Sequence, residues 1–265
     1  MKQYAAIPLL SVLLGGGGFA LRLMQNRTGF DASTGLPVSG NLYALALPIL
    51  LAAAALGFLA LAKKLPDGQD SAAPSFEEAF SSSSAGILSL SVAGLFLWLL
   101  SGAYDAYLGL SVTFSRLDLL TGLLGILAAV SQLPVAAACR RGSGKALNGN
   151  LLLIPVVYAV IRLVLAYRED SVNPALSAYY TDLLALVFLI LACYRASSFA
   201  FQCGRTRRFF VYAALSAVLG ITTLADSHTL AGLLFYGGGA LWVLGLMLLR
   251  SARLAGQTPE AEETP

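Results

Sequence analysis

Charged residues are scarce in this chain: Asp, Glu, Lys and Arg make up 12% of its 265 residues, against about 25% in a typical soluble protein. Hydrophobic residues make up 57%, and the mean hydropathy is +0.75. This balance excludes an ordinary soluble domain and indicates an integral membrane protein. The apolar runs do not alternate every second residue, so we expect membrane-spanning helices rather than barrel strands.

Residues that bind metals or form disulfides are also few. Cys139, Cys193 and Cys203 fall within or at the cytoplasmic ends of apolar runs, and His228 is the only histidine. We therefore expect no disulfide framework, no metal and no cofactor. The basic residues form short clusters without interleaved aromatics, so nucleic-acid binding is not expected either.

Eight apolar runs are each near the length of roughly 20 residues that a helix needs to cross a bilayer. They are residues 4–24, 41–62, 85–104, 117–138, 151–167, 180–199, 209–224 and 230–249. They predict an all-α polytopic bundle that forms one transmembrane domain over residues 1–255. Residues 65–84 are expected to be a cytoplasmic linker, and residues 256–265 a disordered acidic tail. The first run also resembles a signal sequence, but its hydrophobicity continues through Met24, which favours an uncleaved helix.

Basic residues are distributed unevenly between the two ends of these spans. With the amino terminus inside, 12 of the 17 Lys and Arg residues lie on the cytoplasmic side. The positive-inside rule therefore predicts cytoplasmic amino and carboxyl termini. The compact spans and short connections favour the cytoplasmic membrane of a bacterium.

Two local patterns carry structural predictions. Ser75 and Glu78 form a capping box that predicts a short helix carrying Phe76 and Phe80 on one face. We expect this helix to lie at the membrane interface or to lead into the third span. The glycine run 15–18 predicts close packing of the first span against a neighbour, with a glycine-lined substrate path as the alternative.

Arg162 is the most demanding residue, because it lies several positions inside the fifth span. An uncompensated arginine at mid-membrane costs about 2.5 to 3.5 kcal/mol, so it must snorkel, pair with a carboxylate or line a wet cavity. Tyr158 lies one turn away, and Asp105 and Asp182 lie at the same depth in other spans. We predict an outward-facing polar cavity between the first, third, fifth and sixth spans, in which Arg162 and Tyr158 face a small anionic ligand or an acid such as Asp105 or Asp182, with Arg22 as a further candidate. The alternative is an ordinary interface of snorkelling arginines, loop acids and a tyrosine belt.

Catalytic motifs give little support for an enzyme. Asp226, Ser227 and His228 have the letters of a hydrolase triad, but three consecutive residues cannot normally converge on one reacting atom. The favoured function is a membrane-embedded transport or small-ligand-binding protein. A non-enzymatic accessory subunit bound to another membrane protein is the alternative. An envelope enzyme acting on an anionic or lipid-linked substrate is the third; it would use Asp105, Asp182 or His228 as its acid or base.

Overall fold

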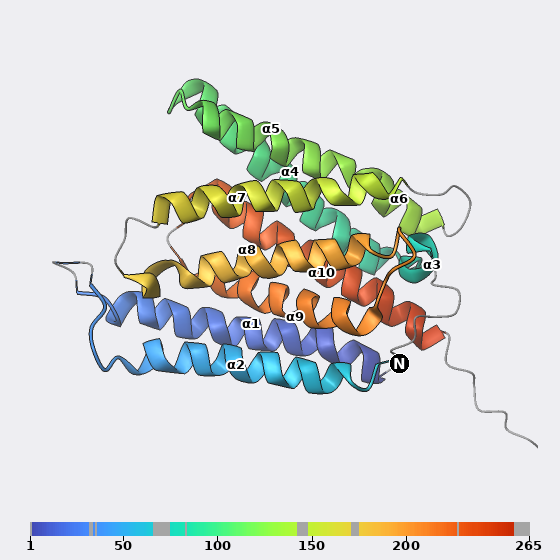
Figure 1. Ribbon diagram of the computed structural model, residues 1–265, viewed down its shortest axis with the longest axis horizontal. Helices are drawn as coiled ribbons and strands as arrows, with labels where there is room; N and C mark the ends of the chain where they lie inside the picture. Colours follow the sequence, from blue (N-terminus) through green and yellow to red (C-terminus); the bar gives the residue numbers. More distant parts are fainter. Residues whose placement is uncertain are drawn as a thin grey trace, which may run out of the picture.

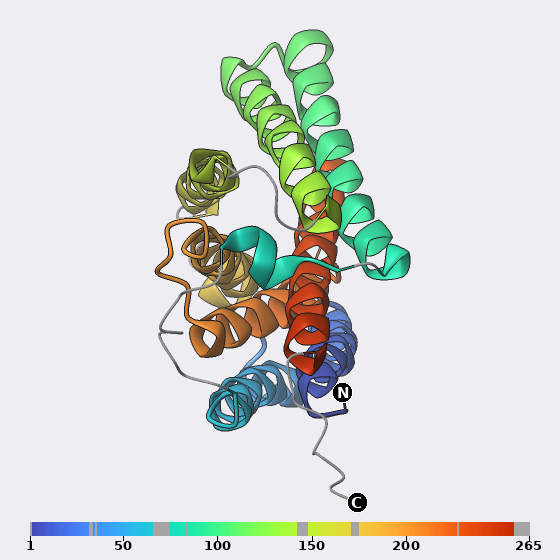
Figure 2. The ribbon, with the colours of Figure 1, turned by 90° about the vertical axis from the view of Figure 1, so that its right-hand side faces the viewer.

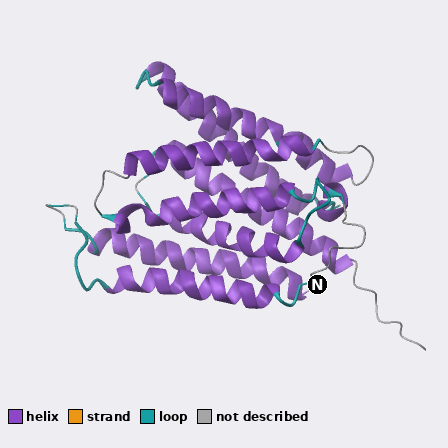
Figure 3. Ribbon diagram, in the orientation of Figure 1, coloured by secondary structure: helices purple, strands orange, loops and turns teal. Residues whose placement is uncertain are grey.

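The computed structural model describes residues 2–31, 34, 36–65, 75–82, 84–141, 148–170, 175–226 and 228–256. Its elements in chain order are α1 (Lys2–Thr28), α2 (Leu42–Ala62), α3 (Phe76–Phe80), α4 (Ala85–Ser111), α5 (Arg116–Ser131), α6 (Leu133–Arg141), the 3-10 helix η1 (Gly149–Leu153), α7 (Ile154–Asp170), α8 (Leu176–Ser197), α9 (Thr206–Thr223) and α10 (Leu230–Gly256). These described segments contain no strand, apart from an isolated bridge between Phe30 and Pro37 (Figure 3). The expected all-α bundle is confirmed.

Seven helical segments are long and apolar enough to cross a membrane, and they correspond to seven of the eight predicted spans. The predicted span 209–224 forms α9. This helix is not among the seven, because Arg207 and Arg208 lower the mean hydropathy of its 18 residues. It nevertheless runs alongside the others and contacts α1, α2, α8 and α10. Fourteen of its residues are buried, so protein rather than lipid surrounds most of this helix.

The long helices lie nearly side by side, with α2 at one edge of the bundle and the α4–α5 pair at the other (Figure 1). Seen from the end, α10 occupies the middle, between the α4–α5 pair and the α1–α2 pair (Figure 2). The amino-terminal end of α1 and the carboxyl-terminal end of α10 lie at the same end of the bundle. We call this the inner end, after the predicted orientation, and the opposite end the outer end.

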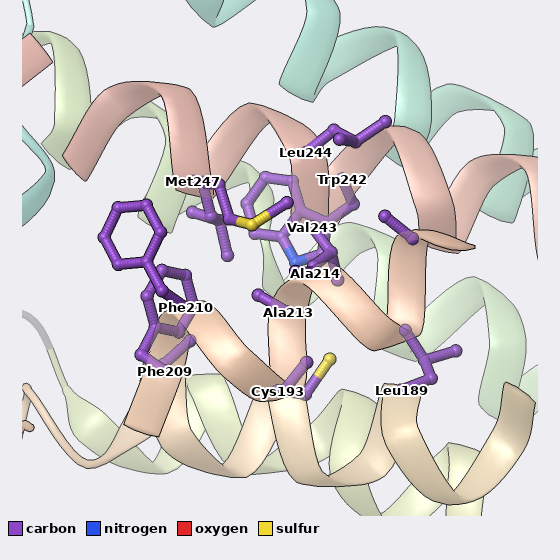
Figure 4. Packing of buried hydrophobic residues seen from close by; sticks show 14 of the residues in the cluster. Leu189, Cys193, Phe209, Phe210, Ala213, Ala214, Trp242, Val243, Leu244 and Met247 are labelled. Carbon is purple, nitrogen blue, oxygen red and sulfur yellow. The ribbon is translucent and has the colours of Figure 1, made fainter. Parts of the chain in front are cut away.

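The central core forms where α8, α9 and α10 meet. Phe209, Phe210 and Ala213 of α9 point toward Val243 and Met247 of α10, and α8 closes the cluster from the other side (Figure 4). All five of these residues are at most 1% exposed. This packing explains why α9 keeps its place in the bundle despite its two arginines.

Small residues allow α4 to approach α10 closely and α1 to approach α9 closely. A Cβ added at Gly94 of α4 would lie 2.6 Å from the backbone nitrogen of Trp242 in α10. In the glycine run of α1, Gly15 packs against Ile221 and Gly18 against Thr222, both in α9. Close helix packing therefore accounts for half of the run, while the other two glycines have no neighbour nearer than 3.9 Å at the added Cβ.

The predicted fourth span is divided into α5 and α6 at Gln132. Pro134 follows the break; it has no N–H and its ring clashes with the carbonyl group four residues earlier. At this break the Gln132 Nε2 donates hydrogen bonds to the Ser131 Oγ at 3.1 Å and to the Leu151 carbonyl oxygen at 2.7 Å. The break thus ties α5 to the start of the next span.

The capping box at Ser75 and Glu78 is present, and it starts α3 as predicted. Of the two expected positions, the structure shows the second: α3 leads into the third span, because α4 begins at Ala85, and Phe76 and Phe80 are 1% and 0% exposed against the protein. Phe80 packs edge-on against Phe209 at 5.4 Å between ring centroids. The helix therefore plugs the inner end of the bundle. Half of the predicted linker (66–74 and 83) and nearly all of the predicted acidic tail (257–265) lie outside the described residues.

Candidate functional site: a polar cavity at the outer end

A cavity of about 440 Å³ opens between helices at the outer end of the bundle. Its lining comes from α4, α5, α7, α8, α10 and the segments that precede α5 and α10. The ionisable groups around it are Asp105, Asp118, Arg162, Asp182, His228 and Tyr236. The predicted cavity is therefore present near the expected residues, but α5 and α10 form part of its wall and α1 does not.

Close packing of α4 on α5 fixes one wall of the cavity. A Cβ on Gly102 would lie 2.7 Å from the Ile126 nitrogen and 2.9 Å from the Gly122 oxygen, so the two backbones are in contact. Asp105 follows Gly102 by nearly one helical turn, which directs it to the same side of α4. The small residues therefore place this carboxylate where α7 can reach it.

Arg162 of α7 pairs with that carboxylate. Its Nη1 lies 2.8 Å from the Asp105 Oδ2 and also donates to the Tyr158 hydroxyl at 3.1 Å. The guanidinium carbon lies 4.5 Å from the ring centroid of Phe235 in α10. The Arg162 side chain is 20% exposed and that of Asp105 is 15% exposed. Arg162 thus has both a carboxylate partner and access to the cavity.

Tyr158 does not line the cavity. It is 1% exposed and packs edge-on against Phe235 at 5.5 Å, and a Cβ on Gly125 would lie 2.8 Å from its hydroxyl oxygen. The prediction that Tyr158 faces a ligand has to be revised, because its buried hydroxyl accepts a hydrogen bond from Arg162 and its side chain is not part of the cavity wall.

Asp182 of α8 and His228 face each other across another part of the wall. The His228 Nε2 lies 3.5 Å from the Asp182 Oδ1, and neither atom has a hydrogen-bond partner among the described residues. Tyr236 donates a hydrogen bond to the same carboxylate, and its ring lies 5.0 Å from that of His228. The two side chains are therefore close together, but no hydrogen bond joins them.

Arg22 lies outside the cavity, which corrects the prediction that grouped it with Arg162. It is 1% exposed, and its Nε lies 2.6 Å from the Oδ1 of Asp226, in the connection between α9 and α10. The same carboxylate accepts hydrogen bonds from Asn26 at 2.9 Å and Thr181 at 3.2 Å. Arg22 therefore does not snorkel; it clamps α1 to α8 and to this connection.

The two ends of the triad-like sequence point to different partners. Asp226 binds Arg22, whereas His228 faces Asp182, and Ser227 between them lies outside the described residues. The expectation that these residues do not converge agrees with the described side chains. Among those residues, no group of three or more His, Cys, Asp or Glu could hold a metal ion.

No protein-family model, no curated protein and no solved structure matches this chain. The chemistry of the cavity therefore has to be derived from its own residues.

The sequence located several cavity residues but gave no reason to join them as the structure does. Asp118 and His228 line the cavity, yet one lies at a helix start and the other beside a turn. The sequence signal that could have grouped them is their position along the predicted spans, because all of these residues lie at or near the outer ends. Which acid pairs with which arginine depends on helix packing, and no sequence spacing encodes that.

Proposed function

We propose that this protein is a membrane-embedded binding or transport protein whose outer cavity accepts a small organic cation. The observation that carries the proposal is the charge balance of the cavity wall. Arg162 is paired with Asp105 at 2.8 Å, which leaves the carboxylates of Asp118 and Asp182 without an arginine in the cavity lining. With His228 either neutral or protonated, the lining has a net negative charge.

This balance favours a ligand of the opposite sign to the anion expected from the sequence. An anion would have to share Arg162 with Asp105 and lie among three carboxylates. A cation leaves that pair intact and gains attraction that is strengthened by the low dielectric of the site. An ammonium group also supplies N–H donors to acceptors that the protein leaves incompletely bonded.

The Asp182–His228 pair supports the same proposal. Buried polar atoms without a hydrogen bond cost about 1 to 3 kcal/mol each, so they are uncommon away from functional positions. The His228 Nε2 and the Asp182 Oδ1 lie 3.5 Å apart without a hydrogen bond. A modest rotation of either side chain toward the cavity therefore breaks no hydrogen bond between them. A ligand ammonium would then occupy the space beside Asp182 and Tyr236.

The test is thermal unfolding of the detergent-solubilised protein with 1,4-diaminobutane, methylammonium or acetate at matched ionic strength. We expect the two amines to raise the melting temperature and acetate to leave it unchanged. A ligand at 100 times its Kd stabilises the folded state by about 2.7 kcal/mol. The Asp182→Asn variant should fold and lose most of this shift, because it lacks the carboxylate charge.

Asp31→Asn is the matched control, since Asp31 is an exposed acid in the α1–α2 connection, away from the cavity. It should keep the wild-type response to both amines. A melting shift with acetate alone would contradict the cation proposal and restore the anionic ligand. An amine response that is equal in wild type and Asp182→Asn would place the ligand elsewhere.

A further inference from the structure

Three of the arginines at the inner end, Arg195, Arg207 and Arg250, differ in the contacts that their guanidinium groups make. Arg250 is 2% exposed and donates to the Thr206 hydroxyl at 2.9 Å and the Ala79 carbonyl at 3.4 Å. Arg207 donates to the carbonyl oxygens of Lys63 and Leu65 at 3.1 and 3.0 Å. Both guanidinium groups tie segments of the chain together.

Arg195, in the last turn of α8, has no such connection. Its guanidinium carbon lies 5.5 Å from the ring centroid of Tyr194 and 5.8 Å from that of Tyr212 in α9. Its Nε is buried and has no hydrogen-bond partner in the described part of the chain. The two rings fix the direction of the guanidinium group, while at least one of its donors is left unused.

Further features of α8 and α9 surround this guanidinium group. Arg208 lies one turn before Tyr212 on α9 and is exposed, so it adds a second positive charge on the same face. On α8, Leu184, Phe188 and Leu191 precede Arg195 at spacings of four, three and four residues, and none of them is fully buried. They form an apolar stripe that runs from the guanidinium group toward the middle of the helix.

We propose that Arg195 and this stripe bind one anionic phospholipid, with its phosphate on Arg195 and an acyl chain along Leu184, Phe188 and Leu191. A guanidinium group presents planar, paired N–H donors that match phosphate oxygens. A headgroup with net negative charge is attracted by the two arginines, whereas a zwitterionic headgroup gains much less. Continuity between a charged end and an apolar stripe selects a lipid over a free phosphate ion.

Native mass spectrometry of the full chain in detergent, titrated with phosphatidylglycerol or phosphatidylcholine, tests the proposal. We expect the wild type to bind phosphatidylglycerol more tightly than phosphatidylcholine. Arg195→Gln should weaken phosphatidylglycerol binding by roughly fivefold, the share of one basic residue near a membrane surface. Arg195→Lys keeps the charge but loses the planar donors, so its affinity for phosphatidylglycerol should lie between those of the wild type and Arg195→Gln.

Arg253→Gln is the matched control, because Arg253 is exposed in the last turn of α10 at the same end of the bundle. It should bind phosphatidylglycerol as the wild type does. Equal binding of the two lipids by the wild type, or an Arg195→Gln variant that binds like wild type, would overturn the proposal. Inorganic phosphate should not compete with the lipid, and effective competition at equal concentration would also overturn it.

Discussion

Arg22–Asp226 and Arg162–Asp105 are both ion pairs at the outer end of the bundle, but their surroundings differ. The Arg22 side chain is 1% exposed and that of Arg162 is 20% exposed. Around the first pair, Asn26 and Thr181 donate additional hydrogen bonds to the carboxylate. Around the second, an open cavity replaces such donors.

The contrast separates a structural pair from a pair that borders a site. A buried pair is tolerated in a membrane when each partner's remaining donors and acceptors are satisfied, and the neighbours of Arg22 and Asp226 do this. Arg162 reaches the same compensation with Tyr158 and the face of Phe235, while the cavity side of the pair stays accessible to water or ligand. Depth in the membrane alone does not distinguish the two roles.

The largest expected effect comes from removing the buried member of the first pair. Arg22→Met should destabilise the protein by about 3 to 5 kcal/mol, because it leaves the Asp226 charge buried and uncompensated. Denaturant unfolding in detergent measures this loss. Arg27→Met, an exposed position on the same helix, should change stability by less than about 0.5 kcal/mol.

If Arg22→Met were no more destabilising than Arg27→Met, the distinction between the two pairs would fail. The double variant Arg22→Met with Asp226→Asn offers a second check. It removes both charges, so it should be more stable than Arg22→Met alone.

The sequence supported the fold much better than the site. Runs of apolar residues and a few turn residues specify where helices begin and end, and the capping box at Ser75 located α3 correctly. These features are local. The ion pair between Arg22 and Asp226 joins residues 204 positions apart. It follows from the packing of α1 against α9, and glycines in the sequence permit such packing but do not say which helices pack together.

The same limit explains the errors. Arg22 was grouped with Arg162 because both lie at the outer ends of spans, although only the latter borders the cavity. The sequence left two positions open for α3, because two phenylalanines on a short helix can face either a membrane interface or a protein core. In both cases the residue types were correct, and the neighbour could not be read from spacing.

The second pair should respond less strongly than the first. Arg162→Met should destabilise the protein by about 1 to 3 kcal/mol, since it leaves Asp105 without its charge-assisted hydrogen bond, but water in the cavity can solvate the carboxylate. The same unfolding assay measures it, and Arg116→Met, an exposed arginine at the start of α5, is the control. A loss as large as that of Arg22→Met would show that the cavity does not relieve the pair.

The ligand response of Arg162→Met also separates the two signs of ligand. Removing the arginine makes the cavity more negative, so the shift caused by 1,4-diaminobutane should persist or grow. If the ligand is instead an anion held by Arg162, the variant should lose every ligand-induced shift. Melting curves of wild type and variant with diaminobutane and with acetate distinguish these outcomes.

The smallest effect on stability is expected at His228. Its Nε2 makes no hydrogen bond with the described residues, so His228→Gln has little to lose and should change the unfolding free energy by less than about 0.5 kcal/mol. Its effect on amine binding should also be small, within about twofold in Kd, because Asp182 and Tyr236 hold the ammonium group and the Gln amide keeps a hydrogen-bond acceptor. A destabilisation above about 2 kcal/mol would instead identify His228 and Asp182 as a structural pair like Arg22 and Asp226, because only a protonated, charged histidine would contribute that much.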